Sequence, residues 1–321
     1  MENRAKWTDL IPDTGLRISE VYDQGDDLYT PGIFAILKKG SGSGAQENFT
    51  GKTGFGKVKQ FEDGEDIPTI ERYKTYTTKV IYRNYGGAVE ITKNLIEDRD
   101  FEAELDEMKD MSRSVNYSVD ESGVQIFNGG FSTAVNVNGY DMTWYNDGKA
   151  QFSTVHPTVV PGASTQSNAS STGIKLTHDN IETGRLALTL QKEDNGLALA
   201  MAGKFTLVIP ETLVKEAKQD LMSELQPQNG NNAINTYKGS VDMVSTIFLD
   251  LTNGGSNTHW FLVNTAMAKL YHVTRQEKRL ESDVNIRNKM LTYTVDARWA
   301  NCSKEWKGTW GSKGDLTAYS G

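Results

Sequence analysis

Three side chains that could form a hydrolytic triad stand close together in the sequence, at Asp147, Ser153 and His156. A serine activated by a histidine, with a carboxylate orienting the imidazole, performs acyl transfer on many unrelated folds. Such a triad is defined by geometry in space, and closeness within one short loop says nothing about that geometry. We therefore interpret His156-Pro157 as a rigid extended turn, because a residue before proline is restricted to extended backbone. A cytosolic hydrolase that uses the 147–157 loop remains a less favoured alternative.

Other motifs for chemistry are not found. Gly54-Phe-Gly56 is followed by Lys57-Val-Lys59, without the third glycine or the strand-to-helix setting of a phosphate-binding loop. The 4 histidines are widely spaced, and Cys302 is the only cysteine, so an internal disulfide is impossible and a zinc–thiolate site is not expected. The sequence therefore predicts no enzyme, with no catalytic residue, no metal ion and no cofactor.

Composition narrows the class of protein without choosing the function. The 321 residues are enough for two domains, and 37% hydrophobic with 24% charged residues is ordinary for a globular protein. The N-terminus has no secretory signal, and no apolar run is long enough to span a membrane. We expect a chain that is made in the cytoplasm and does not enter a membrane. A net charge of −8 argues against general affinity for nucleic acid.

The charges are distributed unevenly in the first third of the chain. Lysines 38, 39, 52, 57 and 59 lie in one extended stretch whose only acid is Glu47. Acids then crowd residues 97–107, where Arg99 is the only base. Acids near a helix start are favoured by the helix dipole, so this cluster is either a solvated face or a landing surface for a basic flap of another subunit. On the second alternative, the predicted inter-subunit contacts are Lys52, Lys57 and Lys59 with Glu97, Asp98, Glu102, Glu104, Asp106 and Glu107.

The strongest helical pattern runs over residues 101–128. Apolar or small residues recur there with alternating spacings of four and three, at Phe101, Leu105, Met108, Ser112, Val115, Val119, Ser122 and Ile126. A helix of that length would reach about 42 Å and is expected to end at Gly129-Gly130. A stiff element of this length is typical of a part that fits against neighbours, and it predicts an assembly protein.

An extended segment precedes this helix. Residues 1–30 are polar, and Pro12 and Gly15 are expected to break any long element, which predicts an arm. Residues 74–85 alternate as in an exposed strand, and 45–85 could form a projecting two-stranded ribbon that ends at Gly86-Gly87. Such a ribbon is marginal alone and would gain stability on a partner. A short helix is expected at 93–98.

The rest of the chain reads as a loop followed by a compact α/β region. Residues 131–175 are rich in Asn, Ser, Thr and Gly and predict a mobile loop. From Leu176 onward, helices are expected at 181–191 and 211–225, and strands at 204–209, 244–251, 260–263 and 291–299, with a final strand that carries Trp306 and Trp310.

This order of elements resembles the major capsid proteins of tailed bacteriophages, with the Hong Kong 97-like fold, and most of all the Mu-like prophage major head subunit. Three segments carry the resemblance: the approach to the long helix at 85–98, the loop 147–157 that ends in His-Pro, and the closing strand at 304–315. The sequence departs from the family in a Ser/Thr-rich insert at 162–172 and in lacking a long N-terminal scaffolding segment.

The resemblance implies an α+β fold with four parts. It implies an N-terminal arm (1–40), an extended β-ribbon loop (41–83), a peripheral domain with the spine helix (84–174 and 289–321) and an α/β axial domain (175–288). The ribbon would lie over a neighbouring subunit.

The resemblance also implies function and partners. Pentamers and hexamers of the chain would self-assemble, in the bacterial host cytoplasm, into the icosahedral shell of a virion. That shell would enclose double-stranded DNA without sequence-specific binding. A separate scaffolding protein, a head maturation protease, a portal and decoration proteins would be partners. A tail or decoration protein is the main alternative, and would share the flap but lack the long helix.

Overall fold

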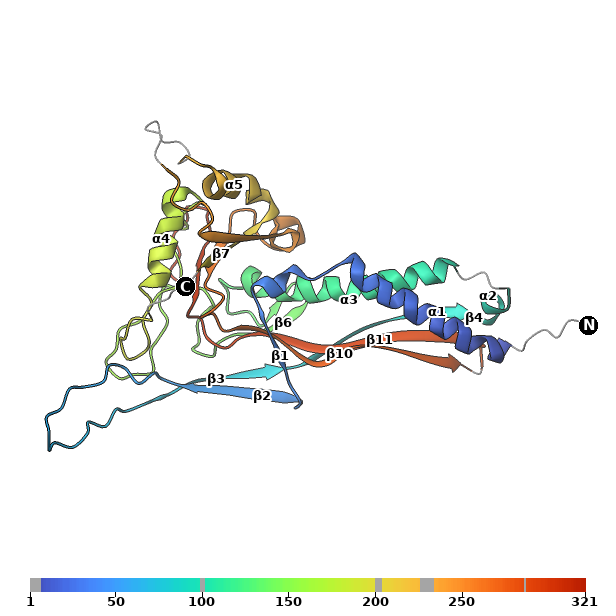
Figure 1. Cartoon of the computed structure of the whole chain (residues 1–321), viewed down its shortest axis with the longest axis horizontal. Helices are drawn as coiled ribbons and strands as arrows, with labels where there is room; N and C mark the ends of the chain where they lie inside the picture. The colour runs from blue at the N-terminus through green and yellow to red at the C-terminus, as the bar shows by residue number, and fades with distance from the viewer. Residues whose placement is uncertain (1–6, 99–101, 200–203, 226–233, 286) are drawn as a thin grey trace, which may run out of the picture.

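The computed structural model describes residues 7–98, 102–199, 204–225, 234–285 and 287–321, with side chains from residue 17 onward. The molecule is elongated (Figure 1). A long limb of helices on a sheet occupies one half, a compact α/β part stands at the other end, and a narrow ribbon projects beyond it. Within the described ranges, no helix combines the length and apolar character that crossing a membrane requires.

The helices and strands follow one another in a mixed order. The α-helices are α1 (Trp7–Leu28), α2 (Lys93–Asp98), α3 (Glu102–Asn128), α4 (His178–Thr189) and α5 (Val214–Met222). The strands are β1 (Lys38–Ser41), β2 (Gln46–Lys52), β3 (Lys74–Ile81), β4 (Arg83–Thr92), β5 (Asn136–Val137), β6 (Tyr140–Thr143), β7 (Phe205–Pro210), β8 (Val241–Thr246), β9 (Trp260–Val263), β10 (Leu270–Asn285), β11 (Met290–Ser303) and β12 (Thr309–Ser312).

The strands form two sheets and one ribbon. The larger sheet has the order β1-β10-β11-β6-β5, and β4 also pairs with β11. Its long strands β10, β11 and β4 are antiparallel neighbours, and α1 and α3 lie along this part of the sheet (Figure 1). The smaller sheet has the order β12-β9-β7-β8, and β2 pairs only with β3 in the ribbon.

The long helix is confirmed. α3 runs from Glu102 to Asn128, and Phe101 lies outside the described residues. The predicted stripe faces the sheet, because Leu105, Met108 and Ser112 are buried at one end and Ser122 and Ile126 at the other. The short helix at Lys93–Asp98 is confirmed as well. The approach to the long helix and its end were therefore readable from local patterns.

The expectation that Pro12 and Gly15 break any long element is wrong. α1 continues through both residues to Leu28. Most helix stability in proteins comes from packing of an apolar face, and α1 has such a face against α3. Ile18 and Tyr22 are buried there, and a Cβ built on Gly25 would lie 2.5 Å from the Lys109 carbonyl oxygen. The close approach of the two helices therefore requires glycine at position 25.

The predicted end of the ribbon at Gly86-Gly87 is also wrong. The β2–β3 pairing stops at Ile81, and both glycines lie inside β4, opposite Asp296 and Val295 of β11. Glycine usually weakens a strand interior, but a Cβ on Gly86 would lie 2.6 Å from the Val295 carbonyl oxygen. The glycine thus permits a close backbone approach within the sheet.

The segment 131–175 has little regular structure, as expected, but it is packed rather than loose. Phe152 and Asn168 have no exposed surface, and Phe152 belongs to the main apolar core beneath α3 and the smaller sheet. β10, which the sequence patterns did not predict, crosses from this core into the long limb. The last strand, β12, pairs with β9 in the smaller sheet, which also contains β7.

Candidate assembly surfaces

The ribbon is firmly anchored at its base. The Lys304 ammonium lies 3.4 Å from the centre of the Phe49 ring and 4.0 Å from that of Tyr271. In cation–π contacts of this kind the face of the ring attracts the charge electrostatically. Farther out, the buried Thr53 accepts a hydrogen bond from the Tyr73 backbone N–H at 3.0 Å. The Asn195 side chain donates to the Gly54 carbonyl at 3.0 Å. These contacts fix the direction in which the ribbon leaves the body.

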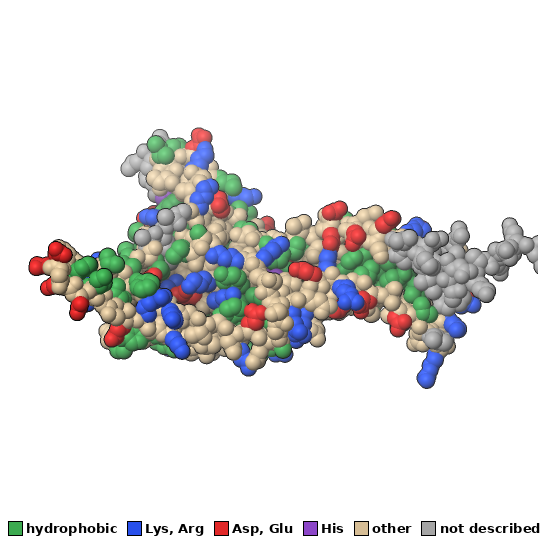
Figure 2. Space-filling model, turned by 60° about the horizontal axis from the view of Figure 1, so that its bottom comes forward, with side chains coloured by type: hydrophobic (Ala, Val, Ile, Leu, Met, Phe, Trp, Pro, Cys, Tyr) green, Lys and Arg blue, Asp and Glu red, His purple; other side chains and the backbone are tan. Residues whose placement is uncertain are grey.

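Beyond this base the chain is open to solvent. Every residue from 57 to 67 is exposed, and Val58 and Ile67 expose 86% and 75% of their surface. The space-filling view shows acidic side chains at the outer end of the loop and hydrophobic ones behind them (Figure 2). The acids are Glu62, Asp63, Glu65 and Asp66. The charge pattern of the sequence predicted contacts for the lysines of this loop but not for its acidic tip or its apolar side chains.

The predicted contact residues lie far apart within one chain. Lys52, at the end of β2, and the loop residues Lys57 and Lys59 belong to the projecting ribbon, whereas the acids surround α2 and the start of α3 at the opposite end (Figure 1). Three of the acids have bases of their own chain as partners: Glu97 with Lys93, Glu102 with Arg17 and Asp106 with Lys109. For Asp98, Glu104 and Glu107, no ion-pair partner lies among the described residues.

Polar contacts join α1 and the segment after it to α3 and β10. Asp120 of α3 is buried and accepts hydrogen bonds from the Tyr29 hydroxyl at 2.5 Å and from the Ile33 backbone N–H at 2.7 Å. Asp26 of α1 pairs with Lys278 of β10 and accepts from the Ser112 hydroxyl at 2.7 Å. No local sequence pattern predicts these contacts, because each joins residues more than eighty positions apart.

The loop that suggested a triad forms a different constellation. His156 Nδ1 lies 2.7 Å from a carboxylate oxygen of Asp147, and both side chains are buried. His156 Nε2 lies 3.0 Å from the Asn168 side-chain oxygen and does not face Ser153. The Ser153 hydroxyl instead donates to the Gly321 carbonyl at 2.5 Å. The structure thus pairs Asp147 with His156 but does not form a serine–histidine–aspartate triad.

The hydrogen bonds around Asn168 fix the role of the histidine. The Asn168 oxygen accepts from the Ser153 backbone N–H at 2.9 Å, while its amide nitrogen donates to the Gln151 carbonyl at 2.8 Å. With the amide oriented this way, Nε2 of His156 donates to the Asn168 oxygen, and Nδ1 faces the Asp147 carboxyl group. The ring stacks on Trp306 at 4.3 Å. His156 is therefore a buried cross-link between segments, which corrects its interpretation as a simple turn.

A buried charge cluster lines the same hollow as the base of the ribbon. Lys307 lies 2.9 Å from Asp194 and 2.8 Å from Glu305, and Glu305 also pairs with Lys269. Burial alone would lower the pKa of Lys307, but the two carboxylates outweigh it and raise that pKa. Burial alone would raise the pKa of Glu305, but Lys307 and Lys269 outweigh it and lower that pKa. The cluster therefore consists of paired charges that hold the chain together.

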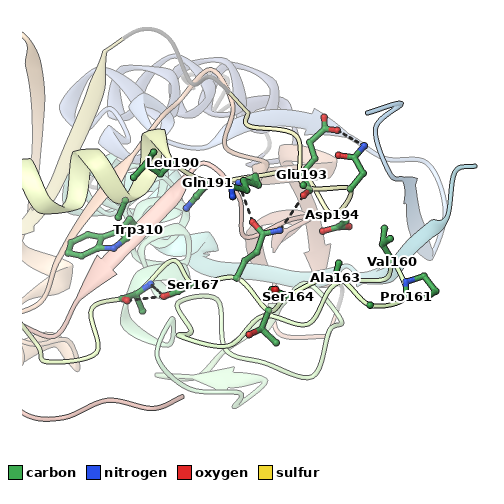
Figure 3. Close-up of a pocket in the computed structure, with 18 residues that line it drawn as sticks. Val160, Pro161, Ala163, Ser164, Ser167, Leu190, Gln191, Glu193, Asp194 and Trp310 are labelled. Carbon is green, nitrogen blue, oxygen red and sulfur yellow. Dashed lines mark hydrogen bonds between the residues drawn. The ribbon is translucent and has the colours of Figure 1, made fainter. Parts of the chain in front are cut away.

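Another hollow lies beside this cluster. A pocket of about 750 Å³ separates the loop 160–169 from the segment 187–196, with Val160 and Pro161 toward one end and Leu190 and Trp310 toward the other (Figure 3). Its carboxylates are engaged within the chain, because Asp194 pairs with Lys307 and Glu193 accepts from Asn195. In the part of the chain that the structure describes, no three metal-binding side chains gather.

Comparisons with known proteins agree with this architecture. A family model for phage capsid protein matches residues 73–310. No curated protein matches. The chain is similar to the bacteriophage JBD30 capsid, with a TM-score of 0.54 and 15% identity over 69% of this chain and 92% of that chain. It is similar to a chain of Mycobacterium phage Patience, with a TM-score of 0.56 and 11% identity over 99% of this chain and 90% of that one.

A third solved structure is the mature capsid of bacteriophage PhiM1, with a TM-score of 0.56 and 9% identity over 88% of this chain and 86% of that chain. Identities this low establish the fold, and the family match covers well over half of the 321 residues. A closest relation to the Mu-like head subunit stays a prediction. The chain belongs to the phage capsid protein family, with the Hong Kong 97-like fold of a major capsid protein.

Proposed function

We propose that pentamers and hexamers of this chain close into an icosahedral shell that encloses a phage double-stranded DNA genome. The observation that carries the proposal is the ribbon, whose residues 57–67 are exposed in the isolated subunit and reach away from the body. A single folded chain has no use for such an exposed segment, whereas a closed shell provides the same partner surface to every copy. The net charge of −8 suits a container that does not bind DNA tightly.

The parts of the subunit have distinct roles in this proposal. The limb, formed by α1, α3 and the strands β4, β10 and β11, is the peripheral domain. The part around α4, α5 and the smaller sheet is the axial domain, and the tips of the axial domains meet at the five- and six-fold centres. Sheet pairing favours a division in which β10 joins the peripheral domain and β12 the axial one. The segment before β1 serves as the arm, and residues 41–83 form the extended loop.

The predicted charge contacts fit this arrangement. Lys52, Lys57 and Lys59 of one copy face acids around α2 and the start of α3 on an adjacent copy. The placement of the two groups at opposite ends of one chain supports a contact between copies and excludes one within a chain (Figure 1). We also propose a separate scaffolding protein, a maturation protease, a portal and decoration proteins as partners, assembly in the bacterial host cytoplasm, and a structural role without catalysis.

The mass of the purified protein tests this function. Five or six copies of the 35.6-kDa chain give capsomers of about 180 or 210 kDa, and closed particles reach the megadalton range. Light scattering coupled to size-exclusion chromatography should find one of these species. A protein that stays a monomer or dimer at high concentration, with or without co-expressed head proteins of its phage, would contradict the proposal.

A further inference from the structure

Within the larger sheet, the strands β10, β11 and β4 form a long three-stranded part with two open edges, one on β10 and one on β4. The two edges differ in charge and regularity. Beyond Thr274 the free edge of β10 carries two register shifts and the exposed charged residues Glu277, Arg279, Glu281 and Asp283. Bulges and charged side chains are the devices by which proteins protect an edge from pairing with another chain. The β10 edge is therefore protected against an added strand.

The opposite edge, formed by β4, has no register shift and carries no charge between Arg83 and Glu90. β4 pairs with β11 from Arg83 to Thr92 without a register shift, and no described strand pairs with its other side. Its centre is Gly86-Gly-Ala-Val89, where the first three residues are exposed, and a Cβ on Gly87 would meet nothing within 4 Å. A long and regular edge of this kind presents a row of unpaired backbone groups to a partner.

The projecting loop contains a segment that matches this edge. Residues 57–61, Lys-Val-Lys-Gln-Phe, are all exposed, and no backbone–backbone hydrogen bond of the described chain involves them. The segment contains neither proline nor glycine, and Val58 and Phe61 favour strand structure. Its backbone donors and acceptors therefore lack backbone partners in the isolated subunit, and Val58 exposes 86% of its surface.

We propose that residues 57–61 of one copy add as a strand to the β4 edge of a second copy. The two segments lie at opposite ends of one chain, so the pairing must join different copies (Figure 1). Charge favours this partner, because the exposed Glu90 ends the β4 edge and Glu97 and Asp98 follow it, while the added strand brings Lys57 and Lys59. Strand addition satisfies the backbone groups of both segments, and side chains set the specificity.

This inference rests on the proposed shell. It makes the contact between copies more specific, because the ribbon then binds its neighbour through backbone hydrogen bonds as well as ion pairs. Hydrogen exchange measured by mass spectrometry on wild-type subunits and particles tests it without any substitution. On assembly, amides in 57–61 and 86–91 should exchange about tenfold or more slowly, whereas those in 277–283 should change little. Unchanged exchange at 57–61 in intact particles would overturn strand addition and leave the shell intact.

Cross-linking identifies the partner edge. The native Cys302 is fully buried, so introduced cysteines can be addressed selectively. Particles of the double variant Val58→Cys, Ala88→Cys, treated with a short bifunctional thiol reagent, should yield covalent multimers on a denaturing gel. The matched control Val58→Cys, Ser282→Cys places the second thiol on the protected β10 edge and should stay monomeric. Equal or greater cross-linking in the control would overturn the assignment, and a wild-type chain that forms no oligomer would overturn the proposed function itself.

Discussion

At the scale of single residues, the polar side chains around His156 hold distant segments of the chain together. Asp147, His156 and Asn168 form a buried network that ties the loop after β6 to Trp306 near the chain's end. The sequence placed the aspartate and the histidine in one loop, but it could not supply Asn168 or the direction of the Ser153 hydroxyl. Those depend on the packing of segments distant in sequence.

Replacing the histidine should therefore destabilise the subunit strongly. His156→Ala removes the hydrogen-bond partner of a buried Asp147 oxygen, and a buried polar group left unsatisfied typically costs about 1–3 kcal/mol of unfolding free energy. The double variant Asp147→Leu, His156→Phe removes both polar partners and should lose clearly less. Urea unfolding of the dissociated subunits measures both. If the His156→Ala subunit were as stable as wild type, the interpretation of His156 as part of a simple turn would hold after all.

The burial of two other histidines predicts that the unfolding free energy depends on pH. Burial lowers the pKa of His259 and of His272 to about 4. An unfolded histidine titrates near 6.5, so between about pH 6.5 and 4 the unfolded chain binds more protons than the folded one. The unfolding free energy is then fully present above about pH 6.5 and falls on acidification, by at most about 3 kcal/mol per histidine.

Unfolding in urea at a series of pH values checks this slope. His272→Gln should give a shallower decline than wild type between pH about 6.5 and 4, whatever its stability at neutral pH. A decline as steep as that of wild type would show that His272 does not contribute through its burial.

At the scale of elements, local patterns predicted what local physics determines. The spacing of Leu105, Met108 and Ser112 and the glycines after Asn128 were sufficient for α3. Non-local packing determined the rest. α1 forms despite Pro12 because it packs on α3, and β10 was missed because its outer half is charged and owes its strand structure to pairing with β11. The sequence predicted contacts between copies only through their charges. It could not predict the open β4 edge, because an edge exists only once the strands have paired into a sheet.

The stripe of α3 predicts graded effects of truncation. Leu105 is 3% exposed, so Leu105→Ala should cost about 2–5 kcal/mol through the cavity that it leaves. Val119 is only partly buried, so Val119→Ala should cost about 1 kcal/mol. Thermal melting of both variants compares them. Equal losses would mean that the two ends of the helix are packed alike.

At the scale of the whole molecule, repetition makes weak contacts important. Each exposed ion pair between copies contributes only about 0.2–1 kcal/mol, but a shell contains many copies of it. Lys52, Lys57 and Lys59 changed together to Glu should leave the subunit folded, with normal circular dichroism, and should block or deform particles. Raised salt should weaken wild-type assembly in the same direction, because exposed charges are screened over about 8–10 Å. Normal particles from this variant, seen by sedimentation, would contradict an ionic contribution of the ribbon.

The central claim is that this chain builds a closed shell, and electron cryomicroscopy of the assembled wild-type protein tests it most directly. The account predicts icosahedral particles in which the α1–α3 limb joins neighbouring capsomers and residues 57–61 lie along the β4 edge of an adjacent copy. Particles with a tubular tail geometry, or subunits that bind only to the surface of a shell made by another protein, would contradict it.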